Sequence, residues 1–176
     1  EGYRIANILE TKLVEFMNIQ HDRKYISIIP AASYGPNDCY DEKINHVIPA
    51  LIQKFHNAKV NKNKYVEVWG TGNARREFLH VDDMASGIVF LLENYYENSP
   101  INLGTGEEIS IKELAKLVAK VTDFKGKISF DKSKPDGIPR KILNSKKIQS
   151  LGWKPSISLI DGLKKTYKIY LDNIKK

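Results

Sequence analysis

A stretch of five residues constrains the fold of this chain more than any other. Residues 25–29 read Tyr-Ile-Ser-Ile-Ile, a nearly continuous apolar run that is followed by Pro30. Such a run is typical of a strand covered on both faces, as in a parallel sheet flanked by helices. Residues 3–20, just before it, carry apolar side chains at helical spacing. A helix that leads into a buried strand predicts an α/β fold.

The rest of the chain repeats this alternation. Helices are predicted over 46–57, 82–93, 111–121, 145–151 and 159–174, and short strands over 65–69, 77–81, 101–103 and 128–130. Asp82 and Asp83 are expected to cap the second of these helices, and Ser110 with Glu113 to form a capping box on the third. Because one helix and one strand cannot cover a sheet, we expect the first two elements to belong to a larger parallel sheet whose other strands lie upstream.

Charge and cysteine content narrow the functional classes. The 28 Lys and Arg residues against 21 Asp and Glu give a formal net charge of +7, but the basic residues are scattered. Without a basic run or a zinc-finger spacing, nucleic-acid binding is disfavoured, and a small polyanion such as a nucleotide diphosphate fits better. The single cysteine, Cys39, predicts a cytoplasmic location and no metal, and no apolar run is long enough for a membrane span.

Five segments carry a resemblance to a known family: PAASYGPND from residue 30, NHVIPALIQKFH from 45, VWGTGNARREFLHVDDMA from 68, INLGTGEEISIKELA from 101 and SKPDGIPRKILNSKKIQSLGW from 133. Together they resemble the GDP-L-fucose synthases, NADP-dependent epimerase-reductases of the extended short-chain dehydrogenase/reductase class. The resemblance implies that residues 1–45 end a truncated Rossmann domain that binds NADP. Residues 46–176 would then form mainly the smaller substrate-binding domain, with some segments returning to the Rossmann domain. It also implies a homodimer.

The same resemblance assigns catalytic and cofactor residues. Tyr3 matches the tyrosine that gives a proton to the sugar C4 oxygen as NADPH supplies hydride, and His46 matches both the acid of the epimerisation and a cofactor contact. Asn7 stands where the family has a lysine, and it can bind ribose hydroxyls but carries no charge. The strand-end residues that would touch the nicotinamide are Pro30, Ala31, Ala32 and Ser33.

Four further residues match substrate contacts of the family. Arg76 would pair with the GDP diphosphate. Lys54 is either a second cation toward the diphosphate or a solvated helix lysine. Trp69 is either an apolar wall of the substrate site or part of the core. Asp136 either accepts a hydrogen bond from a ligand hydroxyl or serves only the turn that Pro-Asp-Gly forms by itself.

Three functions stay open from the sequence. The first is conversion of GDP-4-keto-6-deoxymannose to GDP-L-fucose. The second is reduction or epimerisation of another GDP-sugar, such as a GDP-6-deoxy-heptose. The third is a non-catalytic nucleotide-sugar-binding or assembly module that binds GDP-sugar without NADPH. The chain alone is expected not to turn over, because Gly70-Thr71-Gly72 lacks the third glycine of a dinucleotide fingerprint and opens no helix.

Overall fold

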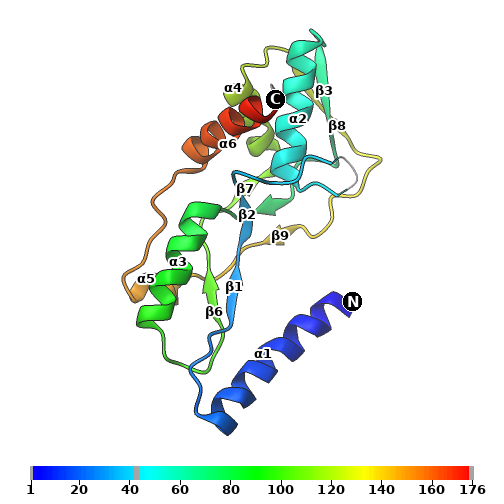
Figure 1. The fold of residues 1–176 in the computed structure, drawn as a ribbon. Helices are drawn as coiled ribbons and strands as arrows, with labels where there is room; N and C mark the ends of the chain where they lie inside the picture. The colour runs from blue at the N-terminus through cyan, green and yellow to red at the C-terminus, as the bar shows by residue number, and fades with distance from the viewer. Residues whose placement is uncertain (1, 42–43, 175–176) are drawn as a thin grey trace.

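A computed structural model describes residues 2–41 and 44–174, without the side chains of residues 3 and 4 (Figure 1). Helices alternate with short strands along the chain, which confirms the predicted α/β class. The helices are α1 (Gly2–His21), α2 (Val47–Val60), α3 (Val81–Asn94), α4 (Ile111–Thr122), α5 (Lys146–Ser150) and α6 (Leu159–Asn173).

The strands pair in small sheets that are mostly parallel. β1 (Ile28–Pro30) pairs with β6 (Ile101–Leu103), β2 (Ala32–Tyr34) with β5 (Phe78–His80), and β3 (Tyr65–Trp69) with β8 (Lys127–Asp131), each in parallel. β4 (Arg75–Arg76) lies between β7 (Ile109–Ser110), which is antiparallel to it, and β9 (Arg140–Lys141), which is parallel. Parallel pairs joined by helical crossovers are the signature of an α/β fold.

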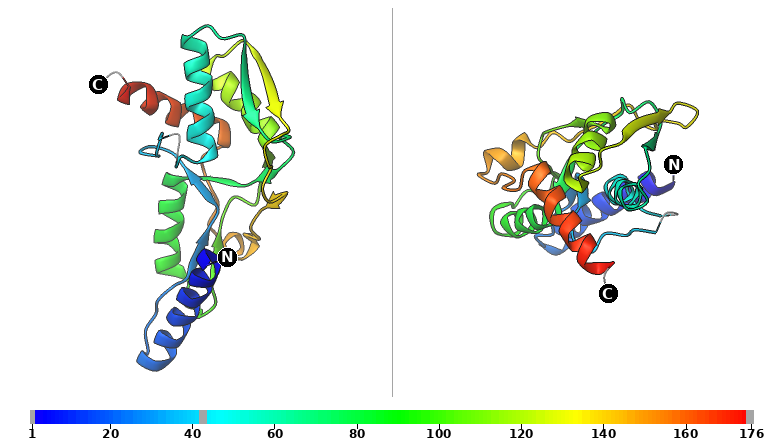
Figure 2. Two further views of the ribbon diagram at one scale, coloured as in Figure 1. Left: turned by 90° about the vertical axis from the view of Figure 1, so that its right-hand side faces the viewer. Right: turned by 90° about the horizontal axis from the view of Figure 1, so that it is seen from above.

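Two hydrophobic clusters lie one above the other along the long axis of the molecule. The larger joins α2, α4 and α6 to the β3–β8 pair, at the top of Figure 1. The smaller joins β1 and β6 to α3 and α5, with Trp153 packed among them. Helix α1 lies at the opposite end of the molecule from α2 and α6, as the views of Figures 1 and 2 agree.

The strand that the apolar run predicts is shorter and more exposed than expected. It begins at Ile28 rather than at residue 25, and Ile29 is 41% exposed, so the prediction of a strand buried on both faces is wrong for the described chain. Within the described residues, β1 pairs along one edge only, with β6. Pro30 has no N–H to donate to the ladder. The strand accommodates it because the hydrogen bond to β6 at this point comes from the N–H of Ala31, which donates to the carbonyl of Leu103 at 2.8 Å.

The cap of α3 also differs from the prediction. His80, not Asp82, is the N-cap, and its Nδ1 accepts a hydrogen bond from the N–H of Asp82 at 3.2 Å. The imidazole nitrogen replaces the usual cap oxygen, and the Asp82 carboxylate pairs with Lys165 instead. The predicted capping box of α4 is confirmed, because the hydroxyl of Ser110 accepts from the N–H of Glu113 while the Glu113 carboxylate accepts from the N–H of Ser110.

Among the described residues, four strands have no counterpart in the sequence prediction: β2, β4, β7 and β9. Each is two or three residues long and pairs with a segment far away in the chain, so no local periodicity marks it. Among the described residues, no helix is both long and apolar enough to cross a bilayer. The described side chains also contain no cluster of three or more His, Cys, Asp or Glu residues suited to a metal.

Candidate functional site

The predicted site residues, apart from Tyr3 and Asn7, line one cavity of about 1040 Å³. They come from separate parts of the chain: the turn between β1 and β2, the start of α2, the end of β3, strand β4 and the loop before β9. Parallel strands end at a common edge, which is where α/β folds place their ligands. The lining residues that had been predicted are Pro30, Ala31, Ala32, Ser33, His46, Lys54, Trp69, Arg76 and Asp136.

The charged side chains on the wall of this cavity are mainly cations. Arg76 is half-buried, and its Nη1 donates to the carbonyl of Arg75 at 2.8 Å, which fixes the guanidinium beside the strand. Lys54 and Lys141 also line the cavity, whereas Asp136 is the one carboxylate among its described lining residues. An excess of positive charge with one planar guanidinium suits a phosphate-bearing ligand.

Lys141 is a lining residue that the sequence analysis does not assign. It lies directly opposite Arg76 in the parallel β4–β9 pair, so the two cations are neighbours across the ladder. The only sequence signal is the basic dipeptide Arg140-Lys141 in the segment after the Pro-Asp-Gly turn. A two-residue strand shows no periodicity, and therefore the face on which Lys141 lies was not predictable.

Trp69 does not pack in the core, so that alternative is wrong. The residue is 64% exposed, on the outward-facing side of the alternating burial pattern of β3. The ammonium groups of Lys54 and Lys134 each lie 5.5 Å from the Trp69 ring centroid. Lys54 also donates to the carbonyl of Glu67 at 3.2 Å. Lys54 is thus held against the indole, and the apolar ring of Trp69 lies near the ammonium groups of Lys54 and Lys134.

Asp136 holds the loop before β9 against the turn after β3. Its Oδ1 accepts from the N–H of Thr71 at 2.7 Å, and its Oδ2 accepts from the Thr71 hydroxyl at 2.6 Å. These hydrogen bonds hold the pKa of Asp136 below its usual range, and Arg76 acts in the same direction. A side chain at Gly70, whose φ is +83°, would collide with this carboxylate. Asp136 therefore does more than form its own turn, because it connects two loops at the rim of the cavity.

His46 lies at the N-terminal end of α2, and its ring makes no hydrogen bond to the helix. It is the N-cap by backbone geometry, and its side chain makes no cap hydrogen bond. The ring is exposed, and its Nδ1 lies 3.6 Å from Oδ1 of Asp38. A carboxylate facing Nδ1 favours a proton on that nitrogen, which leaves Nε2 as the atom that can exchange a proton with a ligand.

Asn7 is not among the residues that line this cavity. The Tyr3 side chain lies outside the described part of the structure. Asn7 is exposed on α1, and its carbonyl accepts from the hydroxyl of Thr11 at 2.8 Å. The amino-terminal end of α1 is the end nearer the middle of the molecule (Figures 1 and 2).

The cavity wall includes a strand end at residues 30–33, and the glycine turn at residues 70–72 lies close to this wall. The exposed residues Ala32 and Ser33 offer backbone groups and small side chains at a strand end, which suits a flat carboxamide-bearing ring. The turn at residues 70–72 leads into β4 rather than into a helix, and Asp136 already occupies the N–H of Thr71. Among the described residues, this turn is therefore not a site for the dinucleotide's diphosphate.

Comparison with known proteins gives consistent matches. A family model described as "NAD dependent epimerase/dehydratase family" matches residues 1–104. The chain is 50% identical over 174 residues to "GDP-L-fucose synthase 1" of Arabidopsis thaliana, an alignment that covers 99% of this chain and 54% of that protein. The chain spans about half the length of the curated relatives it matches.

Solved structures share the fold. A GDP-L-fucose synthetase from Naegleria fowleri bound to NADP aligns with a TM-score of 0.86 at 27% identity, covering 98% of this chain and 55% of that chain. A GDP-6-OMe-4-keto-L-xylo-heptose reductase from C. jejuni aligns with a TM-score of 0.87 at 33% identity, covering 94% of this chain and 59% of that one.

Proposed function

We propose, from the premise that the chain belongs to the NAD dependent epimerase/dehydratase family, that its cavity binds the GDP part of a GDP-sugar. We propose further that it serves an NADP-dependent epimerase and reductase that makes GDP-L-fucose from GDP-4-keto-6-deoxymannose. The observation that carries this proposal is the convergence of Arg76, Lys54 and Lys141 on one cavity beside the exposed ring of Trp69. A diphosphate supplies negative charge to match these three cations, and the indole supplies an apolar surface.

The size of the cavity supports a ligand of this class. About 1040 Å³ slightly exceeds the roughly 300–1,000 Å³ that is typical of small-molecule sites, which leaves room for a large ligand. The cations come from α2, β4 and β9, whereas residues 30–33 add no charged side chain to the lining. This asymmetry favours a ligand with an anionic part and a neutral sugar or ring.

NADP is proposed as the cofactor, and it supplies a hydride when bound. Pro30, Ala31, Ala32 and Ser33 would hold its nicotinamide end, with Asn7 as a candidate contact to the ribose. The relative from Naegleria fowleri that binds NADP has the same fold over nearly the whole of this chain. Tyr3 would donate a proton to the C4 oxygen of the sugar.

His46 is proposed as the acid that protonates the sugar carbon during epimerisation. Its ring is exposed on the cavity wall, and Asp38 faces Nδ1, so Nε2 is the atom proposed to deliver the proton. Imidazole suits this role because its two ring nitrogens can donate and accept protons.

GDP-sugars other than the fucose precursor are the second candidate. The fold is shared with a C. jejuni GDP-heptose reductase at 33% identity, whereas the Arabidopsis relative named as a GDP-L-fucose synthase is 50% identical. The higher identity favours the fucose reaction. A homodimer and a cytoplasmic location complete the proposal, the first supported by the apolar stripe on α1 and the second by the single cysteine.

Separate titrations of the purified chain with GDP, guanosine and NADPH test the function by isothermal calorimetry. We expect GDP to bind at least tenfold more tightly than guanosine. A tenfold difference in affinity corresponds to about 1.4 kcal/mol, which one charge-assisted hydrogen bond can supply. Equal affinity for GDP and guanosine would contradict a diphosphate site. We assign only the nicotinamide end of NADPH to residues of this chain, and tight NADPH binding by the chain would contradict that assignment.

A further inference from the structure

The three-stranded sheet β7-β4-β9 carries like charges opposite one another on both of its faces. Arg75 lies opposite Arg140, and Arg76 lies opposite Lys141. Successive side chains on a strand point to opposite faces, so one cationic pair belongs to each face. Like charges directly opposite in a strand pair repel and weaken the pairing. Each face therefore needs a source of negative charge.

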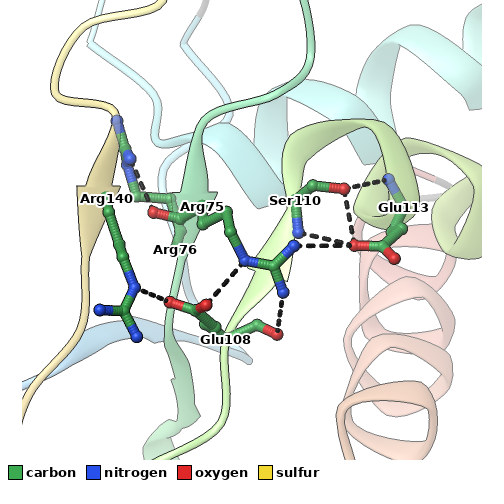
Figure 3. A network of polar contacts seen from close by, with 6 residues as sticks. All are labelled: Arg75, Arg76, Glu108, Ser110, Glu113 and Arg140. Carbon is green, nitrogen blue, oxygen red and sulfur yellow. Dashed lines mark hydrogen bonds and ion pairs between the residues drawn. The ribbon is translucent and has the colours of Figure 1, made fainter.

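Glu108 neutralises the pair on one face. Its Oε1 accepts from Nε of Arg75 at 2.8 Å, and its Oε2 accepts from Nε of Arg140 at 2.7 Å. The carbonyl of Glu108 also accepts from Nη2 of Arg75 at 3.3 Å, and the Glu113 carboxylate lies 3.8 Å from Nη1 of Arg75. Figure 3 shows Arg75 and Arg140 converging on Glu108, with the Arg76 side chain directed away from it. One carboxylate thus connects β4 to β9 from this side.

The other face has no such partner in the described structure. Arg76 and Lys141 line the large cavity, and no described carboxylate lies within 4 Å of either cation. Arg75 and Glu108 line a separate cavity of about 740 Å³, so the sheet divides the two spaces. Asp136 is the one described carboxylate on this cavity wall, and both of its oxygens are bonded to Thr71, so an anionic ligand would be the further source of negative charge for Arg76 and Lys141.

Strand β9 depends strongly on contacts from outside itself. It is two residues long, and residues 132–141 are exposed throughout. Besides the ladder, the N–H of Arg75 donates to the carbonyl of Pro139 at 2.8 Å. Asp136 also bonds this segment to Thr71, so Glu108 is one of a small set of contacts that keep β9 beside β4, and it bridges the two strands through Arg75 and Arg140.

We propose that Glu108 is a positioning residue for the ligand diphosphate. By binding Arg75 and Arg140 on the face away from the cavity, it keeps β4 and β9 in the register that places Arg76 and Lys141 side by side. The inference rests on the proposed function, because it takes a GDP diphosphate as the anion. The carboxylate itself does not touch the ligand, and it acts through the two strands.

The test compares GDP with guanosine in calorimetric titrations of the 176-residue chain. For Glu108→Gln we expect GDP affinity to fall about tenfold. Loss of a group that hydrogen-bonds to a metal ligand costs roughly 10- to 100-fold in affinity at metal sites, and we take the lower end of that range. Guanosine affinity should not change, because the nucleoside does not use Arg76 or Lys141. The matched control is Glu107→Gln, which removes the same charge from an adjacent exposed residue whose side chain makes no ion pair among the described residues.

A double-mutant cycle shows whether Glu108 acts through Arg140. Arg140→Gln alone should lower GDP affinity in the same direction, and the double variant should lose no more than the larger single effect. Additive losses would overturn the proposal. An equal loss of GDP and guanosine affinity in Glu108→Gln would also overturn it, since that is the result of general structural damage. Should Glu108→Gln not fold by circular dichroism, the affinity ratio of Arg140→Gln decides.

The same titrations separate the two proposals. Wild-type chain that does not prefer GDP over guanosine overturns the proposed function and this inference together. Wild-type chain that prefers GDP, with an unchanged preference in Glu108→Gln, overturns only the positioning role.

Discussion

Arg76 is the single side chain on which the proposed ligand site depends most. Its guanidinium is half-buried, is fixed by the carbonyl of Arg75, and lies on the cavity wall beside Lys141. A fixed planar cation can form two parallel hydrogen bonds to phosphate oxygens, which a flexible ammonium cannot.

Arg76→Ala should therefore weaken GDP binding by about 10- to 100-fold, since hydrogen bonds to charged groups contribute roughly 1.5–3 kcal/mol. Arg76→Lys should give an intermediate loss, because the charge remains and the fork is gone. Calorimetric titration measures both. The matched control is Lys120→Ala on the exposed side of α4, and equal losses in Lys120→Ala and Arg76→Ala would show that only net charge matters.

His80 gives the chain a pH dependence of its own. The residue is 1% exposed, and burial lowers its pKa from the ordinary 6.5, with Lys165 acting in the same direction and Asp82 and Asp83 opposing it. The unfolded chain therefore binds a proton that the folded chain does not. Stability is fully present above pH 6.5 and is lost as the pH falls through 6.5 toward the folded pKa. Burial also lowers the pKa of His56, so His56 contributes to the pH dependence of stability in the same direction.

We expect the free energy of unfolding to fall as the pH is lowered from 7.5 to 5.5. The fall is at most about 1.4 kcal/mol per pH unit for each additional proton that the unfolded chain binds. His80→Asn keeps an acceptor at the N-cap of α3 and should make this slope shallower. Urea titrations across the pH range measure it, with the exposed His21→Asn as control. A slope as steep in His80→Asn as in wild type would rule out His80 as a source.

At the scale of elements, α4 shows how local sequence fixes a helix that the site needs. The capping box of Ser110 and Glu113 starts the helix directly after β7, whose partner strand β4 carries Arg76. The same Glu113 carboxylate lies 3.8 Å from Arg75, so the cap and the cationic sheet share one side chain.

Ser110→Ala should cost about 1 kcal/mol of unfolding free energy, as loss of an N-cap does. Urea unfolding at constant pH measures this cost. Ser27→Ala is the control, because the Ser27 hydroxyl has no hydrogen-bond partner among the described residues. A change as small in Ser110→Ala as in Ser27→Ala would mean that packing, not the cap, starts α4.

At the scale of the whole molecule, α1 presents apolar side chains that the described chain does not cover. Six of them are more than half exposed: Ile5, Ile8, Leu9, Leu13, Phe16 and Ile19. They recur at helical spacing, and a contiguous apolar stripe of this kind marks an interaction surface. The proposed homodimer would cover it.

Leu9→Glu combined with Leu13→Glu should shift the chain from dimer toward monomer, because carboxylates in an apolar interface lose their hydration. Sedimentation velocity over a range of concentrations measures the state. Glu10→Lys changes charge on the same helix outside the stripe and serves as control. A wild-type chain that stays monomeric at the highest concentration would refute a dimer of this chain.

Helices and longer strands of this protein follow from the sequence, because their signals are local. The spacing of apolar residues predicts α1 and α4 nearly to their ends, and it predicts β3 with its observed bounds. The resemblance of five segments to one family then identifies nine of the residues on the cavity wall. These results need no knowledge of which segments meet.

What the sequence by itself determined is the α/β class, the main elements and two of the candidate cations, Arg76 and Lys54. Only the tertiary structure decided that Lys141 lies beside Arg76, that Glu108 connects Arg75 to Arg140, and that Trp69 is exposed rather than buried. Strands of two residues have no periodicity, and their partners are about 35 to 65 residues away in the chain. The pairing is fixed by packing and charge in three dimensions, which no local pattern encodes.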